Sequence, residues 1–186
     1  MIIIGITGTL GAGKGTIVDY LAFEKGFVHY SVRAYLLEKI RETGLPENRD
    51  SMFNLANELR AAHGSSYVTD QLYLKAMDSG RDCVIESIRT PGEIESLREK
   101  GHFYLLAADA DPLIRYRRIL FRQSETDLVS WETFTANEER EMSTTDPNKQ
   151  NLRKCIEMAD FILLNNGTRK DLIQQVDHVL DQVLKG

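Results

Sequence analysis

Nine consecutive residues near the start of the chain have the types and spacing of a phosphate-binding loop. They run Gly-Thr-Leu-Gly-Ala-Gly-Lys-Gly-Thr from Gly8 to Thr16, between an apolar stretch and an amphipathic one. The glycines let successive backbone N–H groups turn toward one anion, and the Lys14 ammonium reaches the β- and γ-phosphates of a nucleotide. The sequence therefore predicts an ATP site made by seven residues of this P-loop: Gly8, Gly11, Ala12, Gly13, Lys14, Gly15 and Thr16.

The sequence also contains candidate oxygen ligands for the Mg²⁺ ion that accompanies ATP. The loop motif places a hydroxyl residue directly after the lysine, whereas this chain has Gly15 there and delays the hydroxyl to Thr16. Glu86 ends a predicted strand expected beside the loop, and it is a candidate ligand for Mg²⁺, directly or through water. Asp109, at the end of the following predicted strand, competes for the same role.

Several arginines are placed to bind phosphate groups. Arg89 follows closely after Glu86 and is suited to bidentate phosphate binding. Arg118 and Arg122 are i, i+4 neighbours on one predicted helix, with Arg115 just beside them. Such clustered charge suits phosphoryl transfer, which depends on positioning and on electrostatic stabilisation of the transferring group. The opposite, core-facing side of this helix is predicted to consist of three residues: Leu113, Tyr116 and Leu120.

Alternating strands and helices must position these residues. Short β-rich or apolar runs are expected to form strands over 1–7, 26–30, 82–86, 103–108 and 161–164, with a helix over 17–25 after the P-loop. The order predicts an α/β fold of three layers, a five-stranded parallel sheet with helices on both faces. Ligands of such sheets bind at the carboxyl ends of the strands.

Three helices are expected between the second and third strands, more than a simple crossover needs. Ser31 is predicted to cap the first of them, over 32–43. We interpret the segment of about 29–79 as a helical insertion that binds the phosphate acceptor, with Ser31, Arg33 and Arg60 as candidate contacts. The whole chain, 1–186, is predicted to be a single domain.

Composition limits the class of protein. The chain has 186 residues, 42% of them hydrophobic, and a net charge of −5, so we expect neither a nucleic-acid nor a membrane-surface binder. Two isolated cysteines predict neither a disulfide framework nor a zinc site. There is no basic segment before the short apolar start and no run of transmembrane length. We expect a soluble cytoplasmic protein of unknown oligomeric state.

Together these motifs resemble two families of P-loop kinases, the nucleoside monophosphate kinases and the dephospho-coenzyme-A kinases. The Gly-Ala-Gly-Lys-Gly-Thr ending and Tyr30-Ser31 resemble adenylate kinase. Ala108-Asp109-Ala110-Asp111-Pro112 and the late Asn166-Gly167 turn look more like dephospho-coenzyme-A kinase. The full chain is most similar to a group of adenylate-kinase-like proteins common in archaea.

The resemblance implies roles for individual residues. Arg89 would bind the acceptor's phosphate, Arg118 and Arg122 would lie at the hinge of a lid over about 123–147, and Asn166 and Gly167 would skirt the adenine of ATP. The chain departs from the adenylate-kinase pattern Asp-Gly-x-Pro-Arg, with Glu-Ser-Ile-Arg over 86–89.

The implied activity is transfer of the γ-phosphoryl group of Mg·ATP to a small molecule. A nucleoside monophosphate is the first expected acceptor, and Lys14, Arg118 and Arg122 would then be the catalytic residues. Dephospho-coenzyme A is the alternative acceptor, and its ribose hydroxyl would benefit from a carboxylate base. A nucleotide-binding regulator with slow ATPase activity is the alternative from a different class.

Overall fold

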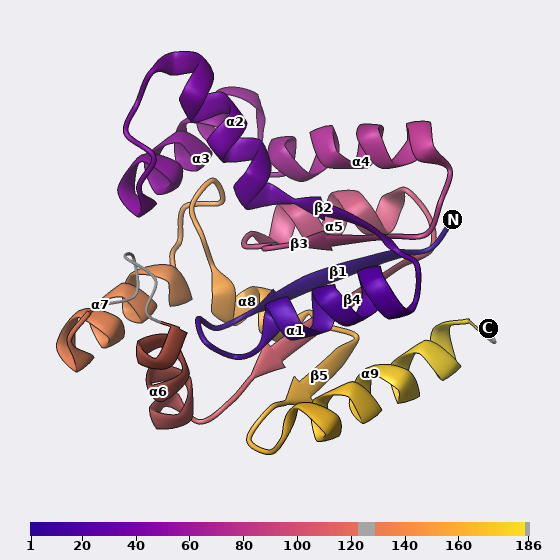
Figure 1. Ribbon diagram of the computed structural model, residues 1–186. Coiled ribbons are helices and arrows are strands. Elements are labelled where there is room, and N and C mark those ends of the chain that lie inside the picture. Colours follow the sequence, from indigo (N-terminus) through magenta and orange to yellow (C-terminus); the bar gives the residue numbers. More distant parts are fainter. Residues whose placement is uncertain (123–128, 185–186) are drawn as a thin grey trace.

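The computed structural model describes residues 1–122 and 129–184. Within these residues, five strands form one parallel sheet in the order β2-β3-β1-β4-β5 (Figure 1). The strands are β1 (Ile3–Gly8), β2 (Val28–Ser31), β3 (Cys83–Glu86), β4 (Phe103–Asp109) and β5 (Phe161–Leu164). The predicted α/β sheet is confirmed, and the carboxyl ends of all five strands meet at one edge.

One face of the sheet is covered by the helix that follows the P-loop and by the last helix of the chain. These elements are α1 (Lys14–Asp19), the π-helical turn η1 (Tyr20–Glu24) and α9 (Arg169–Val183). Ile4 and Ile6 of β1 point into this layer. The helix expected over 17–25 therefore begins earlier, and its second half is π-helical, closed by the bond from the Lys25 N–H to the Tyr20 carbonyl at 3.2 Å.

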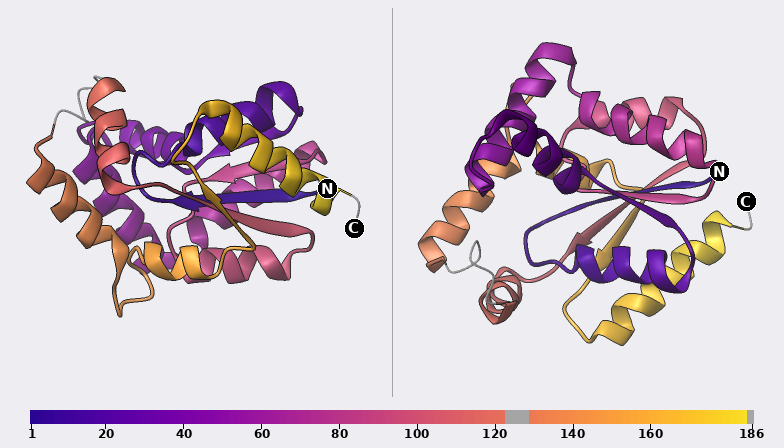
Figure 2. Two further views of the ribbon diagram at one scale, coloured as in Figure 1. Left: turned by 90° about the horizontal axis from the view of Figure 1, so that it is seen from below. Right: turned by 45° about the horizontal axis from the view of Figure 1, so that its top comes forward.

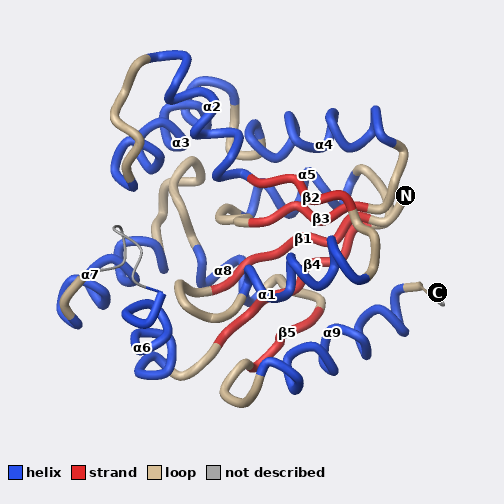
Figure 3. Tube along the Cα trace, viewed as in Figure 1, coloured by secondary structure: helices blue, strands red, loops and turns tan. Residues whose placement is uncertain are grey.

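The other face is covered by three helices: α4 (Tyr67–Ser79), α5 (Pro91–Glu99) and α8 (Leu152–Glu157). Ile3 and Ile85 pack into this layer together with Val68 and Leu97. Because both faces are buried, the central strands are apolar throughout instead of alternating with polar residues. Figure 2 shows the two helical layers from further directions, and Figure 3 separates helices from strands by colour.

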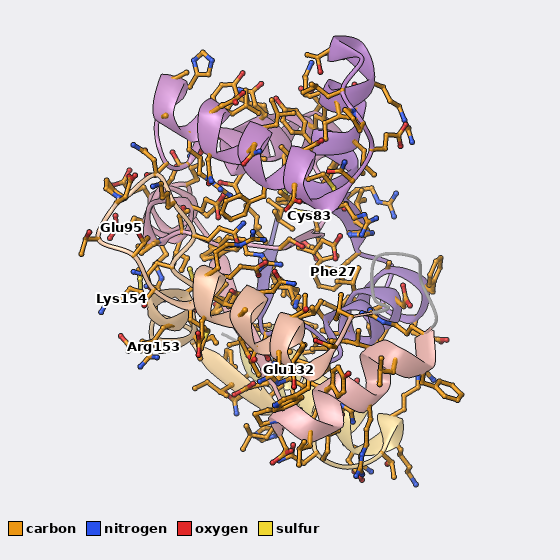
Figure 4. The ribbon with its side chains drawn as sticks, turned by 90° about the vertical axis from the view of Figure 1, so that its left-hand side faces the viewer. Phe27, Cys83, Glu95, Glu132, Arg153 and Lys154 are labelled. Atoms are coloured by element: carbon orange, nitrogen blue, oxygen red, sulfur yellow. The ribbon has the colours of Figure 1, made fainter. Side chains whose placement is uncertain are left out.

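The remaining helices gather at the carboxyl edge of the sheet, at the left in Figure 1. They are α2 (Val32–Thr43), α3 (Arg49–His63), α6 (Pro112–Arg122) and α7 (Trp131–Met142). Figure 4 looks onto this end, with α2 and α3 above and α6 and α7 below. Of the three helices in the predicted insertion over 29–79, α4 packs on β2 and β3, so only α2 and α3 project beyond the sheet.

Local sequence signals fix where these helices begin. The Ser31 hydroxyl accepts from the Ala34 N–H, as expected of an N-cap. Thr90 and Glu93 form a reciprocal capping box at the start of α5, with Pro91 at the first helical position. Of the predicted lid over 123–147, residues 123–128 lie outside the described part of the chain. Among the described residues, no helix has the length and apolar character needed to cross a bilayer.

Gly5 provides a test of how tightly β1 is packed. A Cβ at Gly5 would lie 2.6 Å from Ile88 Cδ1 and from Phe103 Cε2, whereas a Cβ at Gly15 would meet nothing within 4 Å. We expect Gly5→Ala to lower the free energy of unfolding by about 1–3 kcal/mol through overpacking. Gly15→Ala, at a helical position with open space, should raise it by about 0.4–1 kcal/mol.

Urea unfolding of the nucleotide-free protein measures both changes. Equal stability of the wild type and the Gly5→Ala variant would contradict the close packing of β1 against Ile88 and Phe103.

Candidate active site

The P-loop leaves β1 at Gly8 and enters α1 at Lys14, and its glycines are required by the space around it. Gly8 and Gly13 have φ angles of 129° and 101°, a region that side-chain-bearing residues rarely adopt. A Cβ at Gly8 would overlap the Ala108 carbonyl, and one at Gly13 would overlap the Asn165 amide nitrogen. The loop is therefore closed against β4 and against the turn that follows β5.

Side chains from these neighbours hold the loop in place. The Thr9 hydroxyl donates to Asp109 Oδ1 at 2.9 Å, at the end of β4. Asn165 Nδ2 donates to the Ala12 carbonyl at 2.9 Å. The loop conformation thus depends on Asp109 and Asn165, which lie 100 and 153 positions further along the chain than their partners in the loop.

The Lys14 ammonium points into the loop, where it donates to the carbonyl oxygens of Gly8 and Thr9 at 2.8 and 2.7 Å. Burial and the nearby Arg89 guanidinium lower the pKa of Lys14 to about 7, and the carboxylates of Glu141 and Glu86 only partly offset this. The two carbonyl partners are neutral, so a nucleotide phosphate in the loop would supply an anionic partner for this ammonium.

Helix α6 packs against the P-loop through a buried arginine. Arg115 is 3% exposed; its Nε donates to the Ala110 carbonyl at 2.8 Å and its Nη1 to the Leu10 carbonyl at 3.3 Å. Arg115 Nη1 also lies 2.7 Å from Glu138 of α7. This guanidinium connects the P-loop to α7 and does not line the cavity described below.

The prediction for the core-facing side of α6 is therefore wrong for Leu113 and Leu120. Leu113 and Leu120 are 55% and 37% exposed, and Arg115 and Ile119 are buried instead. Hydrophobicity favours the leucines as core residues, but the arginine finds carbonyl and carboxylate partners that compensate its burial. Tyr116 does pack inward, against Trp131 and Phe134 of α7.

A cavity of about 1300 Å³ opens at the carboxyl edge of the sheet, between the P-loop and helices α2, α3, α6 and α7. Single-ligand pockets of about 300–1,000 Å³ are common, so this volume suits two ligands side by side. The lining residues include eleven of the predicted site residues: Gly11, Gly13, Lys14, Gly15, Thr16, Arg33, Arg60, Glu86, Arg89, Arg118 and Arg122.

Five predicted site residues do not line this cavity: Gly8, Ala12, Ser31, Asn166 and Gly167. Ser31 caps α2 and donates to Glu86 Oε1 at 2.6 Å. Asn166 Oδ1 accepts from the Asp111 N–H at 2.7 Å, and the Gly167 carbonyl faces Arg118 Nη2 at 3.5 Å. Each of the three thus contacts or caps an element that supports the cavity wall.

Glu86 and Asp109, the two candidate Mg²⁺ ligands after β3 and β4, have different surroundings. Glu86 lines the cavity; burial raises the pKa of its carboxyl, but hydrogen bonds from His29 and Ser31 and the Lys14 charge outweigh this and lower it. Asp109 is engaged by Thr9 and by the Ala110 N–H and is absent from the cavity lining.

The chain turns sharply after Glu86 and is fixed on both sides of the turn. Ser87 has a φ of 67°, which is unusual for a residue with a side chain and costs of the order of 1 kcal/mol. Ile88 then bonds back to β1, with its N–H donating to the Ile6 carbonyl and its carbonyl accepting from Thr7 Oγ1. Arg89 is thereby delivered to the cavity wall.

Arg89 is held by an anion from α7. Its Nη1 lies 2.5 Å from Glu141 Oε2 and 3.3 Å from Gln150 Oε1. The Glu141 side chain is only 7% exposed, so the pair is largely shielded from water. Arg89 therefore already binds a carboxylate at the point where it borders the cavity.

A family model described as an AAA domain matches residues 4–146, which include the P-loop, β3 with Arg89, and α6. The chain belongs to this AAA-domain family. The matched residues include every residue that lines the cavity except Gln150.

Relatives and solved structures resemble the AAA-domain chain over nearly its full length. It is 26% identical to a UPF0200 protein of Methanocaldococcus jannaschii, over 99% of this chain and 91% of the relative. The Thermus thermophilus protein TT1252 superposes with a TM-score of 0.62 at 24% identity, covering 97% of both chains. Dephospho-CoA kinase from Campylobacter jejuni gives 0.53 at 15% identity, over 99% of this chain and 98% of that one. The fold is that of the P-loop kinases.

Sequence reasoning missed three polar residues around Arg89: Glu93, Glu141 and Gln150. The pattern Thr90-Pro91-Gly92-Glu93 is a capping-box signal that could have identified Glu93 as a helix cap. No local pattern marks Glu141 or Gln150, because their contacts with Arg89 span 52 and 61 positions of the chain.

The lowered pKa of Lys14 predicts proton uptake when ATP binds. In the free protein the Lys14 side chain is mostly a neutral amine above pH 7, and bound phosphates raise its pKa again. At pH 8.5, where the ATP phosphates are already ionised, binding should take up about one proton. At pH 6 the lysine is charged in both states and contributes no uptake. Calorimetry in buffers of different ionisation enthalpy measures this number.

Lys14→Arg is the control, because a guanidinium stays charged throughout this pH range. The variant should bind ATP at pH 8.5 without proton uptake. Absence of uptake by the wild type at pH 8.5 would mean that Lys14 is already charged in the empty loop.

Proposed function

We propose that this chain is an ATP-dependent kinase that transfers the γ-phosphoryl group to a nucleoside monophosphate. One observation carries the proposal: a single cavity joins the P-loop with Lys14 to a wall that contains Arg33, Arg60 and Arg89. A donor nucleotide in the loop and an anionic acceptor at the arginines would face each other across this cavity. In-line transfer requires this arrangement.

The donor side is the P-loop. Its backbone N–H groups and Lys14 would hold the β- and γ-phosphates of ATP, and Arg118 and Arg122 would contact the transferring group. Arg118 supports this role because its Nη1 is buried without a partner among the described residues. The turn at Asn166 and Gly167 would skirt the adenine, next to Arg118.

The acceptor side combines positive charge with an apolar wall. The cavity-lining residues of α2 and α3 include Val32, Leu36, Met52, Phe53 and Ala56. A nucleobase is flat and largely apolar on its faces, so it would suit this wall while its phosphate reaches the arginines. Arg33 is exposed at the rim, whereas Arg60 is deeply buried.

The cavity also fits the Mg²⁺ ion that P-loop kinases use with ATP. Glu86 and Thr16 line it together with Lys14 and offer the hard oxygen atoms that Mg²⁺ binds, directly or through water. The ion would neutralise phosphate charge during transfer. Among the described residues no cluster of three or more His, Cys, Asp or Glu could hold a metal ion, so the nucleotide and water would have to complete its coordination.

The acceptor's phosphate would compete with Glu141 for Arg89. A phosphate dianion next to an ionised carboxylate is repelled, so binding would displace Glu141 from the guanidinium. Because Glu141 belongs to α7, its displacement would couple acceptor binding to movement of the lid over about 123–147. Closure of that segment would exclude water during transfer.

Dephospho-coenzyme A is kept as a second candidate acceptor because of a specific observation. Glu86 and Glu141 are among the four carboxylate residues that line the cavity, with Asp19 and Glu47. A hydroxyl acceptor would benefit from a general base. A phosphate acceptor needs none.

ADP release from Mg·ATP is the test, measured against AMP, GMP, CMP, UMP, dTMP and dephospho-coenzyme A. Saturable stimulation by a monophosphate, with the matching diphosphate formed, would establish the proposed activity. Stimulation by dephospho-coenzyme A alone would replace it with the hydroxyl kinase. A slow rate that no acceptor changes would favour a nucleotide-binding regulator with ATPase activity.

Replacing Lys14 tests the donor side. Lys14→Ala removes the only lysine that lines the described cavity, and we expect kcat/KM for ATP to fall by at least about 100-fold. Lys154→Ala is the matched control, since Lys154 is exposed on α8 and is labelled at the surface in Figure 4. Normal turnover by Lys14→Ala would refute the mechanism.

A further inference from the structure

Arg60 lies in the last turn of α3 and carries unused hydrogen-bonding capacity. It is 1% exposed and lines the cavity. Its Nη2 donates to Glu93 Oε1 at 3.0 Å, but Nε and Nη1 are buried without a hydrogen-bond partner among the described residues. Buried donors without a partner are costly. An anion that enters the cavity and accepts from these unpaired donors would remove the cost.

Glu93 is the residue that fixes the orientation of Arg60. It is fully buried, with no exposed surface, at the start of α5. One oxygen, Oε2, accepts from the backbone N–H groups of Arg89 at 2.6 Å and of Thr90 at 3.0 Å. The other, Oε1, accepts from Arg60. One carboxylate thus fixes the backbone of one cavity arginine and the side chain of another.

Helix capping alone does not account for this arrangement. A capping box needs only the contact between the glutamate and the backbone N–H of the cap residue. The contact with Arg60 adds a buried ion pair, and such pairs recover their desolvation cost only with good geometry and further hydrogen bonds. Nε and Nη1 of Arg60 lack those bonds among the described residues, so an anionic ligand would complete the pair.

We propose that Glu93 is a positioning residue that holds Arg60 and Arg89 as a two-armed clamp for the acceptor's phosphate, with Arg60 as the deep arm. Arg60 Nε and Nη1 each carry N–H donors without a partner, and phosphate oxygens can accept from such donors in charge-assisted hydrogen bonds. Arg89 supplies the second arm from the cavity wall. This inference rests on the proposed function and adds to it which residue orients the acceptor side.

The clamp predicts a selective effect on acceptor binding. Glu93→Gln keeps an oxygen for the backbone N–H groups of α5 but removes the charge that orients Arg60. We expect the KM for the acceptor to rise about 10- to 100-fold, the range for losing a hydrogen bond to a charged group. The KM for ATP should change less than about twofold, because the P-loop contacts neither residue. Arg60→Met should have the same selective effect.

Steady-state kinetics with the monophosphate that saturates the wild type measures these constants, below the melting temperature of each variant. Glu95→Gln is the matched control on the same helix, exposed and labelled at the surface in Figure 4; its constants should equal those of the wild type. An unchanged acceptor KM in Glu93→Gln, or an equal rise in both KM values, would overturn the inference.

The Glu93→Gln variant can fail to fold, since it leaves the Arg60 charge buried and unpaired. The pair Arg60→Met and Arg60→Met/Glu93→Gln then keeps the test open, because the double variant buries neither charge. The acceptor KM should be raised in Arg60→Met and rise little further in the double variant, as expected of coupled residues. A wild-type acceptor KM in Arg60→Met would overturn the clamp. If no acceptor saturates the wild type, the proposed function itself fails, which is a distinct outcome.

Discussion

The constraint on which this structure depends is a buried lysine enclosed by a loop of backbone. Lys14 is desolvated in the P-loop and donates to the neutral carbonyl groups of Gly8 and Thr9. The loop can close around it because Gly8 and Gly13 allow β4 and the Asn165 side chain to approach. This closure requires β4 to lie beside β1, which is the order that the sheet has.

Arginines extend this positive region outward from the loop. Arg115 is balanced by Glu138, and Arg89 by Glu141, so helix α7 contributes a carboxylate to each of two guanidinium groups. Arg140 of the same helix reaches α3, where it stacks over the Phe53 ring. These charged contacts connect α7 to α6, to the segment after β3 and to α3.

The sequence predicted the elements whose signals are local. The P-loop, the parallel sheet, the Ser31 cap and the bounds of α2 follow from glycine spacing, apolar runs and capping residues that lie within a few positions of one another. It failed for α6, where Arg115 is buried in place of Leu113, because burial of an arginine depends on partners from the P-loop and α7. Glu141 escaped prediction for the same reason, since its contact with Arg89 spans 52 positions.

The two carboxylates next to Arg89 differ in a way that matters for a site that must empty and fill. Glu93 is fully enclosed, does not line the cavity and bonds to backbone N–H groups, so it is a permanent part of the fold. Glu141 lines the cavity and accepts a hydrogen bond from Arg89 through its side chain. Under the proposed function, an incoming anion would replace the second without disturbing the first. The charge of Arg89 is thus compensated at the cavity by Glu141, while the enclosed Glu93 preserves the geometry of Arg60 and of the Arg89 backbone.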